Sequence, residues 1–104
     1  MRPAWLCSVF VSAFALLSAA SFAQDNFSKV QIKTEKLTNS TYMLTGAGGN
    51  LGVSIGADAV FVIDDQFAPL TPKIKAAIRK LSKKQVKFVL NTHWHFDHTG
   101  GNEN

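Results

Sequence analysis

Residues 30 to 63 alternate between apolar and polar side chains with the two-residue period of half-buried β-strands. A turn at Asn39-Ser40 and a glycine-rich stretch at 46–49 interrupt this alternation, and a third break follows at Gly56-Ala57-Asp58. We therefore expect four strands, the first two forming a hairpin. The expected strands are residues 30–35, 41–45, 51–55 and 59–63.

The period becomes helical after residue 70. Four apolar residues fall at i, i+3, i+4 and i+7, with Pro72 suited to the first helical position and Thr71 to the cap before it. A near-continuous apolar run at 86–90 is typical of a strand that is buried on both faces. Strands followed by a helix and a buried strand predict an α/β (α+β) fold. The apolar helix residues are Ile74, Ala77, Ile78 and Leu81.

The first 23 residues have the form of a cleavable secretory signal. Arg2 precedes an apolar stretch from Ala4 to Ala20, and small residues follow. We expect cleavage after Ala23, with Ala20 as the alternative, and export to the periplasm or the medium without stable membrane association afterwards. A retained anchor is the competing interpretation. The single cysteine, Cys7, would leave with the signal, so no disulfide is expected.

The basic residues give no indication of a nucleic-acid partner. The chain carries a formal net charge of +4, and several of its cations lie on the outer face of the predicted helix, without aromatic residues between them to stack on bases. Lysines near a helix C-terminus also suit the helix dipole, so we interpret this as a solvated face. Gly48-Gly49 lacks the following helix and lysine of a phosphate-binding loop, and we assign it no chemistry.

The three histidines of the chain lie together near its end, and an aspartate lies between them. His93, His95, Asp97 and His98 fall within six residues, which places four good zinc donors in one short segment. In an extended segment His93 and His95 project to one side, while Asp97 and His98 would face a neighbouring position as the chain turns. The spacing predicts a site for two metal ions. The alternative is a chance cluster of hydrogen-bonded structural histidines.

This H-x-H-x-D-H spacing resembles the signature of the metallo-β-lactamase superfamily. Asn91-Thr92 before it and the segment 99–102 after it agree with the resemblance, as do the upstream segments 48–54 and 59–64. The resemblance implies the first half of a four-layer αβ/βα sandwich, with residues 24–104 as the N-terminal part of an incomplete domain. The family's later ligands, two histidines and a bridging aspartate, are absent from this sequence.

The resemblance also implies an exported zinc-dependent hydrolase that acts on a small molecule. His93 and His95 would hold one ion, and Asp97 and His98 would hold the other. Two ions would polarise the substrate oxygen and lower the pKa of a water between them from 15.7 to roughly 7. The resulting hydroxide would attack an ester, thioester, lactone or β-lactam bond. Asp97, the only carboxylate in the motif, is expected to act in catalysis by orienting that water.

Two other functions remain open at this level. Related proteins with similar ligands are iron enzymes of oxygen or persulfide chemistry, and iron also suits histidine and carboxylate ligands. A metal-binding fragment without catalysis is the other, and the 104 residues alone are expected to be inactive.

Three residues near the motif have two interpretations each. Asp64 either orients the histidines through hydrogen bonds or belongs to a turn. Trp94 and Phe96 either border a substrate pocket or pack beneath the loop, and we expect packing.

Overall fold

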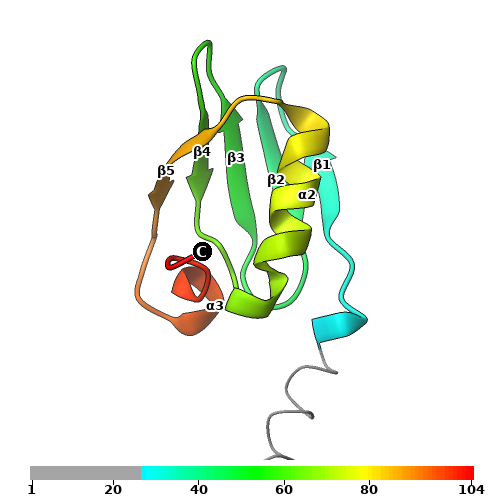
Figure 1. Cartoon of the computed structure of the whole chain (residues 1–104), viewed down its shortest axis with the longest axis vertical. Coiled ribbons are helices and arrows are strands. Elements are labelled where there is room, and N and C mark those ends of the chain that lie inside the picture. The colour runs from blue at the N-terminus through cyan, green and yellow to red at the C-terminus, as the bar shows by residue number, and fades with distance from the viewer. Residues whose placement is uncertain (1–26) are drawn as a thin grey trace, which may run out of the picture.

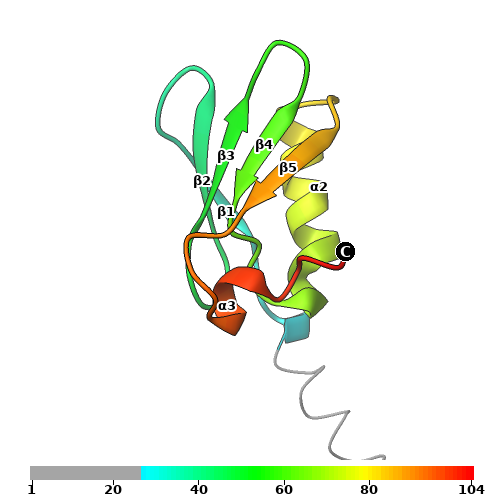
Figure 2. The same cartoon turned by 90° about the vertical axis from the view of Figure 1, so that its left-hand side faces the viewer.

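The computed structural model describes residues 27–104, so the expected signal and its cleavage site lie outside the described residues. Five strands form one sheet in the order of the chain, with helix α2 lying across one face of it (Figures 1 and 2). Between residues 27 and 104, no helix is long and apolar enough to span a bilayer. The strands are β1 (Lys33–Lys36), β2 (Thr41–Thr45), β3 (Leu51–Ile55), β4 (Val60–Ile63) and β5 (Val86–Leu90).

The sheet changes direction at its last strand. Strands β1 to β4 form antiparallel neighbours through short connections, whereas β5 runs parallel to β4. Parallel neighbours need a crossover, and the 3₁₀ turn η1 (Ala68–Leu70) and helix α2 (Thr71–Leu81) supply it. The crossover places the end of β5 beside the end of β4, which brings the residues that follow these two strands together.

The core lies between the sheet and α2. Alternate residues of β2, β3 and β4 point to this side, where Leu44, Val53 and Val60 are fully buried. Ile74 and Ile78 of α2 close the core from the other side, as their helical spacing predicted. Burial of these apolar side chains therefore stabilises strands β2 to β4. The segment that carries the predicted ligands follows this sheet and is supported by it.

The first strand begins later than predicted. β1 starts at Lys33 rather than at Val30, and Val30 and Ile32 instead pack against the core from the preceding segment. Lys73 of α2 explains the difference, because its ammonium donates hydrogen bonds to the carbonyl oxygens of Phe27, Ser28 and Val30. These carbonyl groups are directed to the helix and not to a neighbouring strand.

The predicted cap of α2 is wrong. Leu70 occupies the cap position and Thr71 is already helical, because the 3₁₀ turn η1 leads directly into α2. Pro72 is therefore the second helical residue and not the first, although it still lies in the first turn. The Thr71 hydroxyl is buried without a hydrogen-bond partner among the described residues.

Strand β5 forms where the sequence predicts, but its predicted burial is wrong. All five of its residues are exposed, and Phe88 exposes 60% of its surface. β5 is the edge of the sheet, and β4 is its only strand neighbour within residues 27–104. The exposed ring of Phe88 lies 6.0 Å from the half-buried ring of Phe61 on β4.

Candidate metal centre

The predicted ligands lie in a loop at the end of β5. This ligand loop comprises residues 91–99, and its last four residues form the short helix α3 (Phe96–Thr99) (Figure 2). The loop bends over residues 92–94, and the carbonyl oxygen of His95 then accepts hydrogen bonds from the amides of His98 and Thr99. The chain therefore turns back on itself between the second and third histidine.

This turn brings the three imidazole rings together. The ring centroids of His93 and His95 are 4.7 Å apart, and those of His93 and His98 are 4.0 Å apart. Asp97 Oδ2 lies 3.5 Å from His98 Nε2. The sequence predicted that His93 and His95 would form one group and Asp97 and His98 another. The structure joins the two groups, with the His93 ring between the other two.

Asp64 supports the loop from beneath. Its carboxylate is almost completely buried and accepts hydrogen bonds from the Thr92 amide and hydroxyl, both at 2.7 Å, and from His98 Nδ1 at 2.7 Å. Burial raises the pKa of Asp64, but the hydrogen bonds from Thr92 and His98 outweigh burial and hold the pKa below its ordinary value. Of the two interpretations of Asp64, the structure supports the one in which it orients a histidine.

The same hydrogen bonds fix which nitrogen of two histidines is free. Because Asp64 is an acceptor, His98 carries its proton on Nδ1, and its Nε2 keeps a lone pair. The Thr92 hydroxyl gives its proton to Asp64 and therefore accepts one from His93 Nδ1, 2.9 Å away. One buried carboxylate thus leaves Nε2 of both His93 and His98 free to bind a metal.

The glycine-rich loop between β2 and β3 lies directly against the ligand residues. A Cβ atom on Gly48 would stand 2.6 Å from the Cβ of Asp97, and one on Gly49 would overlap the His98 ring. Gly48 also has a φ of +79°, which favours glycine. Sequence reasoning assigned this segment no chemistry. The structure makes it a wall of the site, which requires residues without side chains.

Asp65, which sequence reasoning did not single out, anchors the end of the ligand loop. Its amide donates to the carbonyl oxygen of His98, and its Oδ1 accepts a hydrogen bond of 2.9 Å from the buried amide of Gly101. Burial raises the pKa of Asp65, although the Gly101 hydrogen bond opposes this effect. In the sequence, the only sign of this role is that two acidic residues directly follow an apolar strand. That pattern does not show that Asp64 and Asp65 have different roles.

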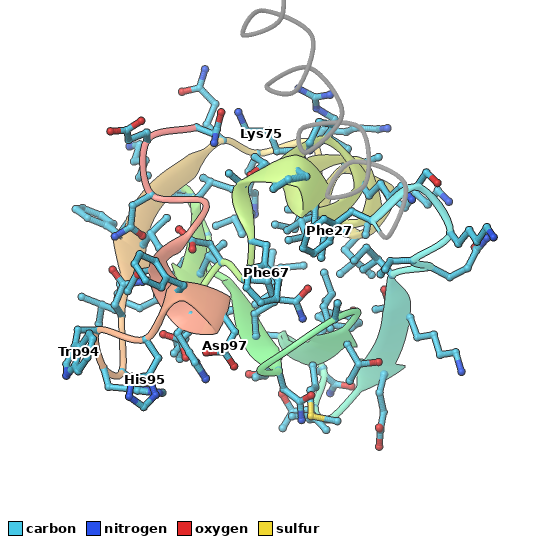
Figure 3. The ribbon with its side chains drawn as sticks, turned by 90° about the horizontal axis from the view of Figure 1, so that it is seen from below. Phe27, Phe67, Lys75, Trp94, His95 and Asp97 are labelled. Carbon is cyan, nitrogen blue, oxygen red and sulfur yellow. The ribbon has the colours of Figure 1, made fainter. Side chains whose placement is uncertain are left out.

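The aromatic residues of the motif do not pack as predicted. Trp94 and Phe96 each expose 78% of their surface, so the expectation that they lie beneath the loop is wrong. Asp64 occupies the inner side of the loop, which leaves the outer side to the aromatic rings. Figure 3 shows Trp94 and His95 at the outer edge of the loop, with Asp97 closer to the middle of the molecule. Both aromatic side chains are accessible to a substrate.

The donor types suit zinc, which binds neutral imidazole and carboxylate ligands. His93 and His98 present free Nε2 atoms, and His95 and Asp97 lie beside them. As they stand in residues 27–104, no three or more His, Cys, Asp or Glu side chains are arranged to hold a metal ion. The cluster therefore matches a zinc site in its chemistry and in the orientation of two ligands, but its donors do not yet converge on one point.

Comparison with solved structures finds a similar fold in metallo-β-lactamases. A mutant of the FEZ-1 enzyme from Legionella gormanii is 25% identical, with a TM-score of 0.63 over 70% of this chain and 28% of that chain. DIM-1 metallo-β-lactamase is 26% identical, with a TM-score of 0.60 over 72% of this chain and 38% of that chain. A B3 metallo-β-lactamase with an active-site glutamic acid shares the fold, at 24% identity and a TM-score of 0.65 over 79% of this chain and 32% of that chain.

These similarities confirm the predicted α/β fold as part of a metallo-β-lactamase sandwich. The chain spans about a third of the length of the structures that it matches. No curated protein matches the sequence. The family model of the metallo-β-lactamase superfamily matches residues 44–104, which include the end of β2, strands β3 to β5, the glycine-rich loop, Asp64 and the whole ligand loop. The chain therefore belongs to the metallo-β-lactamase superfamily.

Proposed function

We propose that the protein is an exported zinc-dependent hydrolase in which His93, His95, Asp97 and His98 are metal ligands. The observation that carries the proposal is the pair of histidines whose Nδ1 atoms are engaged through Asp64, so that their Nε2 atoms are free. A structural histidine needs no such arrangement, whereas metal-binding histidines regularly donate their second nitrogen to a carboxylate or another oxygen.

Bound zinc supplies a Lewis acid and lowers the pKa of water to roughly 7. The residues of this chain determine where that chemistry takes place. Asp64 orients His98 directly and His93 through Thr92, and it cannot act as the base because its oxygens are buried and already accept three hydrogen bonds. Asp97 is partly exposed beside His98 Nε2, so its carboxylate is the group placed to orient an attacking water and accept its proton.

The proposed substrate is a small molecule with an ester, thioester, lactone or β-lactam bond. The solved relatives are named as β-lactamases, and one DIM-1 structure is of the enzyme exposed to ceftazidime. The exposed Trp94 and Phe96 beside the ligands offer apolar surface to such a molecule. We propose that the leading apolar segment directs export, and that neither nucleic acid nor the membrane is a partner of the exported protein.

The test measures metal content and hydrolysis in the full-length protein, meaning a chain that includes the complete domain. We expect about two zinc ions per complete domain by elemental analysis, loss of turnover after chelation, and recovery when zinc is returned. A panel of β-lactam, thioester, lactone and ester reporters identifies the bond. His93→Ala should abolish turnover, and Asn39→Ala, in a turn of the opposite sheet edge, should not. Iron in place of zinc, or zinc without turnover of any reporter, would contradict the proposal.

A further inference from the structure

Gln66 has an unusual combination of backbone conformation and burial. It is 0% exposed, and its φ of +57° lies in the left-handed region that glycine adopts freely and other residues rarely adopt. A residue that only filled this turn would be a glycine. A large polar side chain in this conformation therefore points to a role for the side chain itself.

The Gln66 side chain reaches the glycine-rich loop between β2 and β3. Its Nε2 donates a hydrogen bond of 2.6 Å to the carbonyl oxygen of Gly49. Its Oε1 faces Gly46, where an added Cβ atom would stand 2.7 Å away. The carboxamide therefore lies under the loop and holds the carbonyl group of one of the residues that contact the ligands.

The backbone of Gln66 contacts the other side of the site. A Cβ atom on Gly100, which follows α3, would stand 2.7 Å from the Gln66 carbonyl oxygen. Gln66 thus lies between the glycine-rich loop and the end of the ligand loop, and it follows Asp64 and Asp65, which hold the ligand loop in place. Three consecutive residues after β4 therefore connect both loops to the rigid sheet.

We propose that Gln66 is a positioning residue that holds the glycine-rich loop, residues 46–50, against Asp97 and His98. The loop covers one side of the ligands with backbone alone, and the hydrogen bond to Gly49 keeps it there. The effect of this hydrogen bond on substrate binding rests on the proposed hydrolase function. The position of the loop does not, because it follows from contacts between residues of this chain alone.

The first test measures loop motion in the metal-free full-length protein. Gln66→Met keeps the length and approximate volume of the side chain and removes the carboxamide. The ¹⁵N order parameters of Gly48 and Gly49 should fall from about 0.85, typical of a rigid backbone, to below about 0.6. The matched control, Gln85→Met, changes an exposed glutamine at the far end of β5 and should leave both values unchanged. Equal order parameters in Gln66→Met and the wild type would overturn the proposal.

A second variant covers the case in which Gln66→Met does not fold. Glycine adopts the backbone conformation of residue 66 freely, and Gln66→Gly also removes the hydrogen bond to Gly49. It should therefore lower the order parameters of Gly48 and Gly49 as well. In the zinc-loaded protein, loss of this hydrogen bond should raise KM by about two- to tenfold, the effect of one ordinary hydrogen bond, with kcat changed less. A wild type without hydrolytic activity would refute the proposed function, and the order parameters would still decide the role of Gln66.

Discussion

The core beneath α2 and the ligand loop at the end of β5 are stabilised in opposite ways. Beneath α2, apolar residues such as Leu44 and Val53 are fully buried, and packing alone holds them. In the ligand loop the residues from 91 to 96 are exposed, and the loop and its end are held by hydrogen bonds that the buried carboxylates of Asp64 and Asp65 accept. The fold therefore depends on apolar burial, whereas the site depends on a few polar contacts.

This difference has a practical meaning for substitutions. Removing apolar volume under α2 acts on the centre of the sheet, since strands β2, β3 and β4 pack on the same cluster. Removing a polar contact after β4 acts first on the orientation of the ligands, because those contacts join the loop to a frame that is already stable. Substitutions in the two regions should therefore differ in how far they change stability, from a large loss in the core to almost none at the exposed side of the ligand loop.

Leu44→Ala should have the largest effect. Leu44 is 0% exposed in the centre of the core, and a buried Leu→Ala substitution lowers the free energy of unfolding by about 2–5 kcal/mol. Urea denaturation of the full-length protein measures the change. The control is Leu37→Ala, at a position with 54% exposure, which should change stability by less than about 0.5 kcal/mol. Equal effects of the two variants would mean that the core is elsewhere.

Asp64→Ala should affect stability less than Leu44→Ala and affect metal binding more. It removes the acceptor of a part-buried hydrogen bond from the Thr92 amide, at a cost of about 1–3 kcal/mol in the free energy of unfolding. Loss of a carboxylate behind a ligating histidine should also weaken zinc affinity by roughly 10- to 100-fold. Titration with a competing chelator gives the affinity. Asp58→Ala, in an exposed turn, is the control. Unchanged zinc affinity in Asp64→Ala would remove Asp64 from the site.

Two substitutions of Asp65 distinguish the effect of its hydrogen bond on stability from the effect of its charge. Asp65→Ala removes the acceptor of the buried Gly101 amide and should lower the free energy of unfolding by about 1–3 kcal/mol. Asp65→Asn keeps an acceptor and removes a carboxylate whose pKa is raised by burial, so at pH 7 it should be at least as stable as the wild type.

The pH dependence of the Asp65 variants follows from the direction of the shift. A carboxyl group with a raised pKa contributes stability below its unfolded pKa of about 3.9, and that contribution is lost as the pH rises through the folded value. The advantage of Asp65→Asn over the wild type should therefore shrink as the pH is lowered toward 4. Denaturation curves at several pH values measure it. A constant difference between the two would show that the buried charge has no cost.

Trp94→Ala should have the smallest effect on stability. The side chain exposes 78% of its surface, so its removal should change the free energy of unfolding by less than about 0.5 kcal/mol. Thermal denaturation provides the comparison with the wild type. A loss of 2 kcal/mol or more, on the order expected for a buried aromatic residue, would restore the interpretation that the ring packs beneath the loop.

The local pattern of apolar and polar residues predicted most of the strands of the sheet. The bounds of 41–45, 51–55 and 86–90 were correct as strands, because the period of apolar residues is a property of each segment by itself. The start of β1 was missed because Lys73, more than forty residues away, binds the carbonyl groups before it. The exposure of β5 depends on which elements flank it, and no local pattern contains that information.

The candidate site was predictable only in its proposed ligands. The spacing of His93, His95, Asp97 and His98 predicted a metal-binding segment, and the structure brings the three imidazole rings together. The residues that orient and enclose this segment were not accessible in the same way. The roles of Asp65 and Gln66 depend on contacts with Gly101 and Gly49, which are distant in the sequence, and on a backbone turn that glutamine rarely adopts.

The parallel pairing of β5 with β4 also orders the events of folding. The antiparallel strands β1 to β4 can pair by closing short loops, whereas β5 must wait for the crossover through α2. The ligand loop follows β5, so Asp64 can reach Thr92 and His98 only when this last strand has paired. A chain that has completed only its hairpins therefore lacks the contacts with the carboxylate that orients these two residues.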